Sequence, residues 1–204
     1  MTRNLIHDHS GSSAAEFAIV LPLLLIFLLG IVDSGRWLWT FNRAEKAAQM
    51  GARFAVVANP VTSAINSSYL GVGGLTQGDA IPASAFGKIT CTATGTVSAV
   101  TATCSCTTSP CPTGTANNLA FQNIMNRMRG FLPEIQPSNL TIEYSSSGLG
   151  YAGNPNGADI SPLVTVKLSG LQFTPIASFL LVLMPRPAAT TSLTAEDLSG
   201  SDSN

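Results

Sequence analysis

The chain has 204 residues, of which only 10% are charged, and its formal net charge at pH 7 is −1. This near-neutral balance gives no electrostatic basis for binding nucleic acid, so we expect no nucleic-acid partner. Hydrophobic residues make up 45% of the chain, but many of them concentrate in one block near the N-terminus. The remainder, roughly 150 residues, is about the size of one domain.

Residues 14–32 form an apolar run, AAEFAIVLPLLLIFLLGIV, whose only ionisable side chain is Glu16. As a helix the run would be roughly 28 Å long, close to the thickness of a bilayer core. A helix is the form that satisfies its own backbone hydrogen bonds in lipid, and Pro22 would loosen only one turn. The run is long for a signal peptide, and no A-x-A site follows it. The sequence therefore predicts one transmembrane helix in contact with membrane lipid.

Four cysteines lie close together far downstream: Cys91, Cys104, Cys106 and Cys111. An even number of cysteines outside the cytosol indicates two disulfides, for which three pairings are possible. Direct pairing of Cys104 with Cys106 is the least favourable, because so short a loop strains the bond. No histidine follows His9, so we expect disulfides rather than zinc, no other metal site and no cofactor.

Two features of the chain predict opposite orientations in the membrane. The N-terminal flank of the apolar run holds Arg3, whereas the other flank holds Arg36, Arg43, Lys46 and Arg53. A count of positive charges therefore places the C-terminal side in the cytoplasm. The cysteines place it outside, where disulfides persist. We follow the cysteines, because the motif that precedes the apolar run requires the same orientation.

That motif reads Gly11-Ser-Ser-Ala-Ala-Glu16-Phe17. It resembles the prepilin peptidase site G-x-x-x-x-E-[YF] of Flp- and Tad-type pilins, in which cleavage follows the glycine. The resemblance implies a cytoplasmic leader over residues 1–11 and a mature chain that begins at Ser12. The N-terminus would then lie in the cytoplasm and the C-terminal domain in the periplasm or outside the cell.

A longer stretch, GSSAAEFAIVLPLLLIFLLGIVDSGRWLWTFNRAEKAAQMGAR, resembles the TadE-like family of minor pseudopilins. In that family an apolar run with an early proline is closed by an acidic residue and a Gly-Arg pair, here Asp33, Gly35 and Arg36. The small residues from Ala47 to Arg53 also fit. The segment TTSLTAED loosely resembles the family's terminal strand. The resemblance implies three kinds of partner: a prepilin peptidase, other pilins or pseudopilins, and inner-membrane pilus assembly proteins.

The position of Glu16 near the bilayer predicts that its carboxylate needs an ion-pair partner. A carboxylate near the bilayer costs about 2.5 kcal/mol or more unless it is paired. Cleavage after Gly11 would create a charged amine on Ser12, one helical turn from Glu16. Glu16 could pair with this amine or with that of a neighbouring subunit, and the resemblance to type IV pilins suggests a role in subunit register. The alternative is a glutamate at headgroup level without a role.

We expect the helix to continue beyond the membrane until Asn59-Pro60 ends it. Small residues form two rows at helical spacing in this extension: Ala44, Ala48 and Ala52, and Ala47, Gly51 and Ala55. Such rows let helices approach closely. They would pack either against other pilin stems or against this protein's own domain, and the sequence leaves both possibilities open.

The rest of the chain predicts an α+β fold, a small mixed domain with a mainly antiparallel sheet and one or two packed helices. Residues 61–87 are loop-rich, 89–105 suit a hairpin with a turn near Gly95, and 140–144, 164–168 and 190–194 suit strands. Residues 117–131 show helical spacing of Ala120, Ile124, Met128 and Phe131, with Leu119 and Phe121 beside them. The apolar run 179–184 suits a buried strand, a core helix turn or an exposed patch.

These elements divide the chain into a prepilin-type leader (1–11), a transmembrane helix with its extracytoplasmic extension (12–59), an extracytoplasmic α+β domain (60–198) and a disordered tail (199–204). Both histidines, His7 and His9, lie in the leader, so no Ser-His or Cys-His pair can form in the outer domain, and we expect no enzyme.

The leading hypothesis is a minor pilin-like subunit, processed by a prepilin peptidase and inserted in the bacterial inner membrane. It would take part in assembly or initiation of a Tad/Flp-type pilus for surface adhesion, with its entry into the filament left open. The alternative is an uncleaved, membrane-anchored extracytoplasmic binding module.

Overall fold

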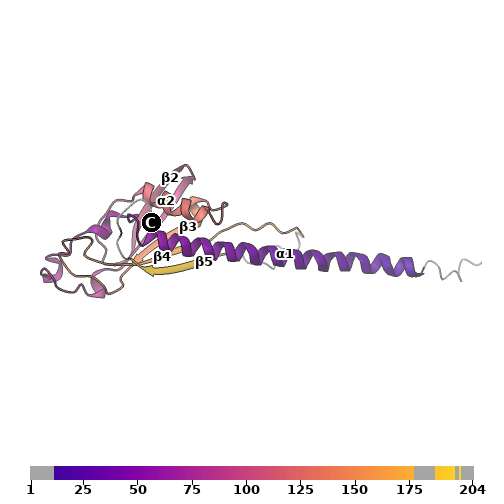
Figure 1. Ribbon diagram of the computed structural model, residues 1–204, viewed down its shortest axis with the longest axis horizontal. Helices are drawn as coiled ribbons and strands as arrows, with labels where there is room; N and C mark the ends of the chain where they lie inside the picture. Colours follow the sequence, from indigo (N-terminus) through magenta and orange to yellow (C-terminus); the bar gives the residue numbers. More distant parts are fainter. Residues whose placement is uncertain (1–11, 177–186, 196–197, 199–204) are drawn as a thin grey trace, which may run out of the picture. The chain divides into compact units, whose positions relative to one another are not determined.

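The structure, a computed structural model, describes residues 12–176, 187–195 and 198 (Figure 1). Its long helices and strands are α1 (Ser12–Ala55), β1 (Lys88–Thr96), β2 (Ala99–Thr108), α2 (Asn118–Arg129), β3 (Leu140–Ser145), β4 (Leu163–Leu168) and β5 (Ala189–Thr194). Four short 3-10 helices are η2 (Ser63–Asn66), η3 (Val72–Gly74), η4 (Ala83–Ala85) and η5 (Pro137–Asn139). The predicted α+β class, a long N-terminal helix followed by a small mixed domain, is confirmed.

The described residues fall into two compact units. The first, which we call the stem unit, contains residues 12–40 and 173–176. The second, which we call the sheet unit, contains residues 41–172, 187–195 and 198. Helix α1 contributes residues to both units. The leader, the apolar run 179–184 and the tail, for which the sequence also makes predictions, lie outside the described residues.

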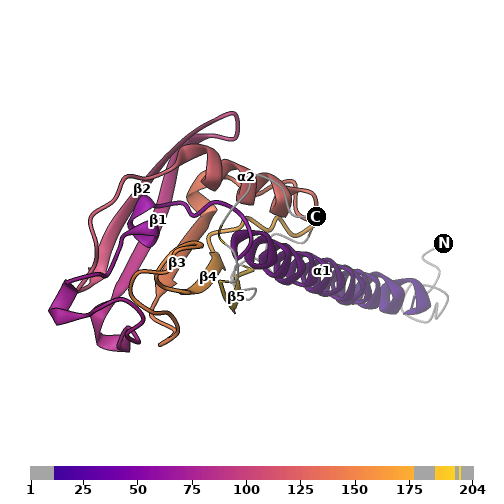
Figure 2. The same ribbon diagram turned by 60° about the vertical axis from the view of Figure 1, so that its left-hand side comes forward.

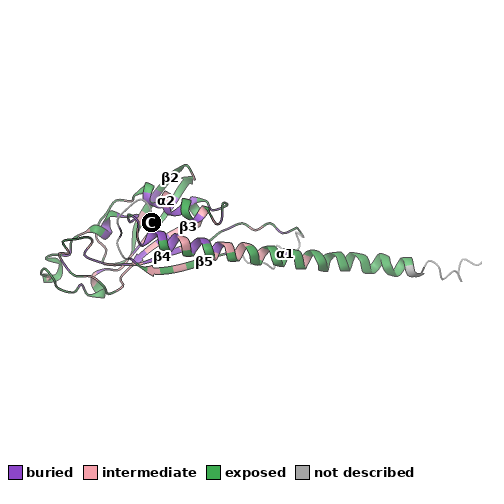
Figure 3. Cartoon of the chain, in the orientation of Figure 1, coloured by how far each residue is buried: buried purple, intermediate pink, exposed green. Residues whose placement is uncertain are grey.

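The apolar run of α1 buries almost nothing within the described chain. Its large apolar side chains from Phe17 to Val32 are 37–69% exposed, and Figure 3 shows this stretch of α1 in green. The helix passes through Pro22 without ending. Among the described residues it is the one helix that is long and apolar enough to cross a membrane. A surface of this kind needs lipid or other apolar chains to cover it.

The sheet unit contains one five-stranded sheet, ordered β2-β1-β3-β4-β5, with every neighbouring pair antiparallel (Figures 1 and 2). Strands β1 and β2 form the predicted hairpin. Their last pair is Thr96 with Ala99, so the turn lies at Val97-Ser98 and not at Gly95. Gly95 belongs to β1, where its φ of +97° is a conformation that favours glycine.

The predicted alternation of the inner strands is confirmed. Leu140, Ile142 and Tyr144 of β3 are buried and their neighbours are half-buried, which is the period of two that a strand with one covered face requires. The phenol of Tyr144 accepts a hydrogen bond of 2.9 Å from the backbone N–H of Val61. This bond ties the segment that follows α1 to the centre of the sheet.

Helix α2 is capped by Asn117, whose side-chain oxygen accepts from the N–H of Ala120. Its buried face is formed by Ala120, Phe121, Ile124, Met125 and Met128. The sequence placed Leu119 beside this face, and that was wrong, because Leu119 is 62% exposed. At about 100° per residue, Leu119 points to the side of the helix opposite the buried face.

The small residues of α1 pack inside this protein's own domain. Ala44, Ala47, Ala48, Ala52 and Ala55 have no exposed surface and belong to the core of the sheet unit. A Cβ placed on Gly51 would lie 2.6 Å from the Cγ and Sδ of Met128, so helix α2 approaches α1 where α1 has no side chain. The structure thus favours the second of the two possibilities left open by the sequence. Helix α1 ends at Ala55, and turn residues lead to Asn59-Pro60.

Candidate functional site: the stem and its clasp

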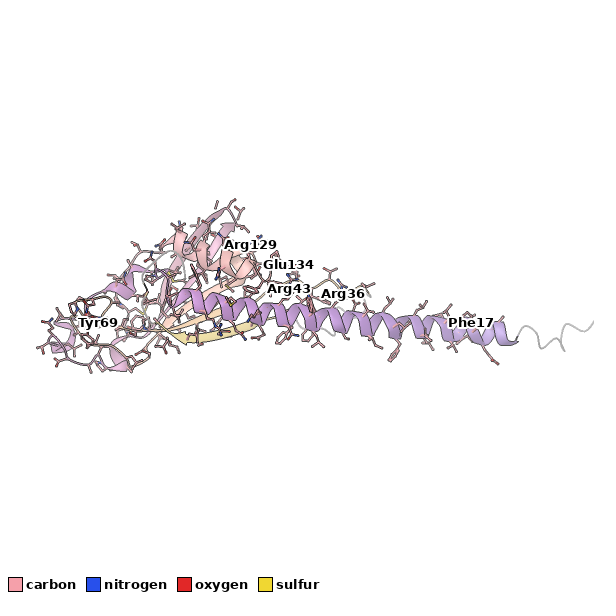
Figure 4. The ribbon with its side chains drawn as sticks, viewed as in Figure 1. Phe17, Arg36, Arg43, Tyr69, Arg129 and Glu134 are labelled. Carbon is pink, nitrogen blue, oxygen red and sulfur yellow. A yellow bond between two sulfur atoms is a disulfide. The ribbon has the colours of Figure 1, made fainter. Side chains whose placement is uncertain are left out.

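The predicted processing site lies at the N-terminal end of the described chain. Gly11 is outside the described residues, and Ser12 is the first residue of α1. Glu16 follows one helical turn later and is exposed, as is Phe17, whose side chain is labelled in Figure 4. The helix therefore gives Glu16 the i, i+4 spacing from Ser12 that the sequence required for an ion pair with a new N-terminal amine.

Just after the apolar run, a carboxylate is completely buried in the stem unit. Asp33 has no exposed surface. Its Oδ1 accepts a hydrogen bond of 2.9 Å from Nη1 of Arg36, three residues along the helix. The same oxygen accepts from the backbone N–H of Ile176, also at 2.9 Å. Asp33 therefore joins α1 to a segment that is 143 residues away in the sequence.

Arg36 holds the same segment in two further ways. Its Nη2 donates to the backbone oxygen of Thr174 at 3.4 Å. Its guanidinium carbon lies 5.6 Å from the ring centroid of Phe173, within the range of a cation–π contact. We call Asp33, Arg36 and residues 173–176 the stem clasp; Arg36 is labelled in Figure 4.

The clasp explains how a charge can be buried beside an apolar run. An isolated buried carboxylate is costly, and pairing with a cation together with a hydrogen bond from a backbone N–H offsets much of that cost. Gly35 is the third residue of the pattern that closes the apolar run, beside Asp33 and Arg36. A Cβ at Gly35 would meet nothing within 4 Å, so the described chain gives no steric reason for a glycine there.

In the sheet unit, the four cysteines form two disulfides, as predicted. Cys91 pairs with Cys104, its direct neighbour across the β1–β2 ladder, and Cys106 pairs with Cys111. The unfavourable pairing of Cys104 with Cys106 does not occur. Among the described residues, no three His, Cys, Asp or Glu side chains gather into a group that could hold a metal ion.

Asp159 organises the loops at the end of the sheet unit that contains Tyr69, which Figure 4 labels. The backbone N–H groups of Tyr69, Gly153 and Asn154 donate to its carboxylate at 2.7–3.0 Å, and the Ser68 hydroxyl also donates. Burial alone would raise the pKa of Asp159, but these donors outweigh burial and hold it below its usual range. Burial and the nearby Asp159 charge raise the pKa of Tyr69 to about 12.

Two acidic residues of the sheet unit, Glu134 and Glu143, are engaged with cations. Glu143 accepts from Nζ of Lys167 at 2.7 Å and lies 3.5 Å from Nζ of Lys88, so it bridges strands β1, β3 and β4. Glu134 lies 3.9 Å from the guanidinium of Arg43, whose Nε donates to the Phe131 backbone oxygen (Figure 4). The two carboxylates thus sit in separate ion pairs.

A comparison with protein families found a match over a segment that includes the apolar run. The family described as TadE-like protein matches residues 11–53. This segment is similar to the TadE-like family. The match begins at the glycine of the predicted cleavage motif and includes Asp33, Gly35 and Arg36. No curated protein and no solved structure matches the chain.

The match covers 43 of the 204 residues and does not include most of the sheet unit. It contains one side of the stem clasp, Asp33 and Arg36, but not residues 173–176, which form the other side. Sequence reasoning found Asp33 and Arg36 only as residues that close the apolar run. It missed their partners, because nothing local marks Phe173 or Ile176 as neighbours of α1.

Proposed function

We propose that the chain is a minor pilin-like subunit that takes part in assembly or initiation of a Tad/Flp-type pilus. The observation that supports this most is the apolar run of α1, whose large side chains from Phe17 to Val32 remain exposed within the described chain. This surface lies inside the segment that matches the TadE-like family. The stem of a pilin also has an apolar surface that must be covered, first by lipid and then by other stems.

The proposal includes an energetic path from membrane to assembly. Lipid tails and apolar side chains cover the run about equally well, so exchange of lipid for neighbouring stems never exposes it to water. Packing between stems and interhelical hydrogen bonds then decide the association. Partners of this chemistry are other pilins or pseudopilins and the inner-membrane proteins that assemble them.

The proposed orientation places the leader in the cytoplasm and the sheet unit on the periplasmic or outer side of the inner membrane. The disulfides Cys91–Cys104 and Cys106–Cys111 support it, since such bonds persist in oxidising compartments. A prepilin peptidase would cut after Gly11. The role of the chain is structural and not enzymatic, and adhesion to surfaces is the function of the assembled pilus.

Replacement of Glu16 by alanine tests the assembly role. We expect Glu16→Ala to reach the membrane fraction at the normal level, because removal of a carboxylate makes the run more apolar. The number of pili per cell, counted by electron microscopy, should fall at least fivefold because the register pair is lost. Glu45→Ala is the matched control, since Glu45 lies on the same helix beyond the apolar run. Normal piliation by Glu16→Ala would contradict the role of Glu16.

A second variant separates the pilin from an uncleaved binding module. Gly11→Ala should leave the leader attached and abolish piliation if the peptidase acts at this site. An uncleaved binding module would not change in size when Gly11 is replaced. Unaltered size and unaltered piliation in Gly11→Ala would therefore reject processing as part of the function.

A further inference from the structure

The sheet unit has a polar hollow of about 460 Å³ between the segment that follows α1 and the start of α2. None of its lining side chains is charged. The lining residues are Asn59, Pro60, Ser63, Asn66, Thr115, Ala116, Asn117, Asn118 and Leu119. The volume falls within the range of roughly 300–1,000 Å³ that is typical of small-molecule sites. Six of the nine residues carry amide or hydroxyl groups, so the hollow can hydrogen-bond a neutral ligand without offering it a counter-charge.

Two of these amides are held in a fixed orientation. The side-chain oxygen of Asn117 accepts from the N–H of Ala120 at 3.1 Å, and that of Asn118 accepts from the N–H of Ala102 at 2.8 Å. In each case the oxygen is occupied, and the amide NH2 group makes no hydrogen bond within the described part of the chain. Donors that are already oriented lose little side-chain entropy on binding, which raises the affinity for an acceptor.

The other lining groups complete a mixed surface. The hydroxyls of Ser63 and Thr115 are 3.3 Å apart and can donate or accept. Asn66 is exposed, and its side chain makes no hydrogen bond within the described residues. Leu119, which points away from the buried face of α2, is 62% exposed and supplies apolar surface beside the donors. The site thus combines fixed amide donors, hydroxyls and one apolar contact.

We propose that this hollow binds a neutral saccharide, and that it prefers a sugar with an acetamido group. Sugar hydroxyls match the amides and hydroxyls of the lining, and the absence of charged lining groups disfavours acidic ligands. An acetamido carbonyl can accept from the oriented amide NH2 groups of Asn117 and Asn118, while its methyl group packs against Leu119. The inference is independent of the pilus function, because binding can be measured on the purified chain whether or not it is cleaved or assembled.

The test uses the full-length protein in a detergent without a sugar headgroup, and saturation-transfer NMR on the ligand signals. The probes are tri-N-acetylchitotriose, maltotriose and inorganic phosphate. We expect tri-N-acetylchitotriose to bind in the millimolar range or tighter, its methyl signals to receive the strongest transfer, and phosphate, followed by ³¹P line width, not to bind. Binding of both saccharides, with tri-N-acetylchitotriose the tighter, also supports the proposal, whereas binding of maltotriose alone would overturn the preference for an acetamido group.

Variants locate the binding. Asn66→Ala and Leu119→Ala change exposed side chains that do not hold the fold together, and each should weaken binding at least fivefold. Asn126→Ala is the matched control, because Asn126 is an exposed asparagine of α2 outside the hollow. The proposal is overturned if neither saccharide binds at about 10 mM, if phosphate binds in their place, or if Asn126→Ala weakens binding as much as Asn66→Ala does.

Discussion

At the scale of residues, two buried carboxylates, Asp33 and Asp159, accept hydrogen bonds from backbone N–H groups. Asp33 is buried beside the apolar run, but it receives the guanidinium of Arg36 and the N–H of Ile176. Asp159 is buried among loops, but it receives three backbone N–H groups. In both cases a carboxylate substitutes for secondary structure by satisfying backbone donors that have no strand or helix partner.

The stem clasp predicts a local effect of Asp33→Ala. The N–H of Ile176 would lose its acceptor, and a hydrogen bond to a charged group is worth about 1.5–3 kcal/mol. We therefore expect the amide of Ile176 to exchange with deuterium roughly 10–100 times faster, as measured by hydrogen exchange with mass spectrometry. Ser34→Ala is the control, since the Ser34 hydroxyl donates to the backbone oxygen of Gly30 in its own helix. Equal protection in both variants would show that the clasp does not hold this segment.

Asp159 predicts a pH dependence. Its pKa is lowered in the folded chain, so its stabilisation is fully present above the unfolded pKa of about 4 and is lost as the pH falls through the folded pKa. At pH 7, Asp159→Asn should cost roughly 2–3 kcal/mol, because an amide NH2 would face backbone donors.

The measurement is denaturant unfolding of both proteins between pH 2.5 and pH 7. The difference in free energy of unfolding between wild type and Asp159→Asn should stay constant above about pH 5 and shrink below about pH 4. A difference that does not change with pH would mean that the charge of Asp159 contributes nothing to the loops.

At the scale of elements, α1 has two different surfaces along one helix. Its first part exposes large apolar side chains, whereas its last turns present alanines and Gly51 to the core of the sheet unit. The two parts therefore need different partners, lipid or other stems for the first and this protein's own α2 for the second. Low side-chain volume is what allows the close approach of Met128.

This division predicts effects of different size for two neighbouring substitutions. Ala48 has no exposed surface, so Ala48→Leu should overpack the core and lower the free energy of unfolding by about 1–3 kcal/mol. Gln49→Leu adds similar volume at an exposed position and should change it by less than about 0.5 kcal/mol. Thermal unfolding followed by circular dichroism compares them. If Ala48→Leu leaves the stability unchanged, the core packing of this row would be contradicted. The alanines would then be a surface for other stems.

At the scale of the whole molecule, the sequence predicted those features that are encoded locally. The alternation of Leu140, Ile142 and Tyr144 predicted β3, and the helical spacing around Ile124 predicted α2. The apolar run and the motif before it predicted the stem helix. It missed what depends on distant contacts. The clasp joins residues 143 positions apart, and the pairing of Cys91 with Cys104 follows from the register of a hairpin whose turn lies two residues beyond Gly95.

The central claim is that the exposed apolar helix is a processed pilin-type stem. The most direct test is the intact mass and N-terminal sequence of the protein extracted from the membranes of a host that has a prepilin peptidase. The account predicts a chain that begins at Ser12, with both disulfides formed. A membrane-extracted chain that begins at Met1 or Thr2 would contradict it.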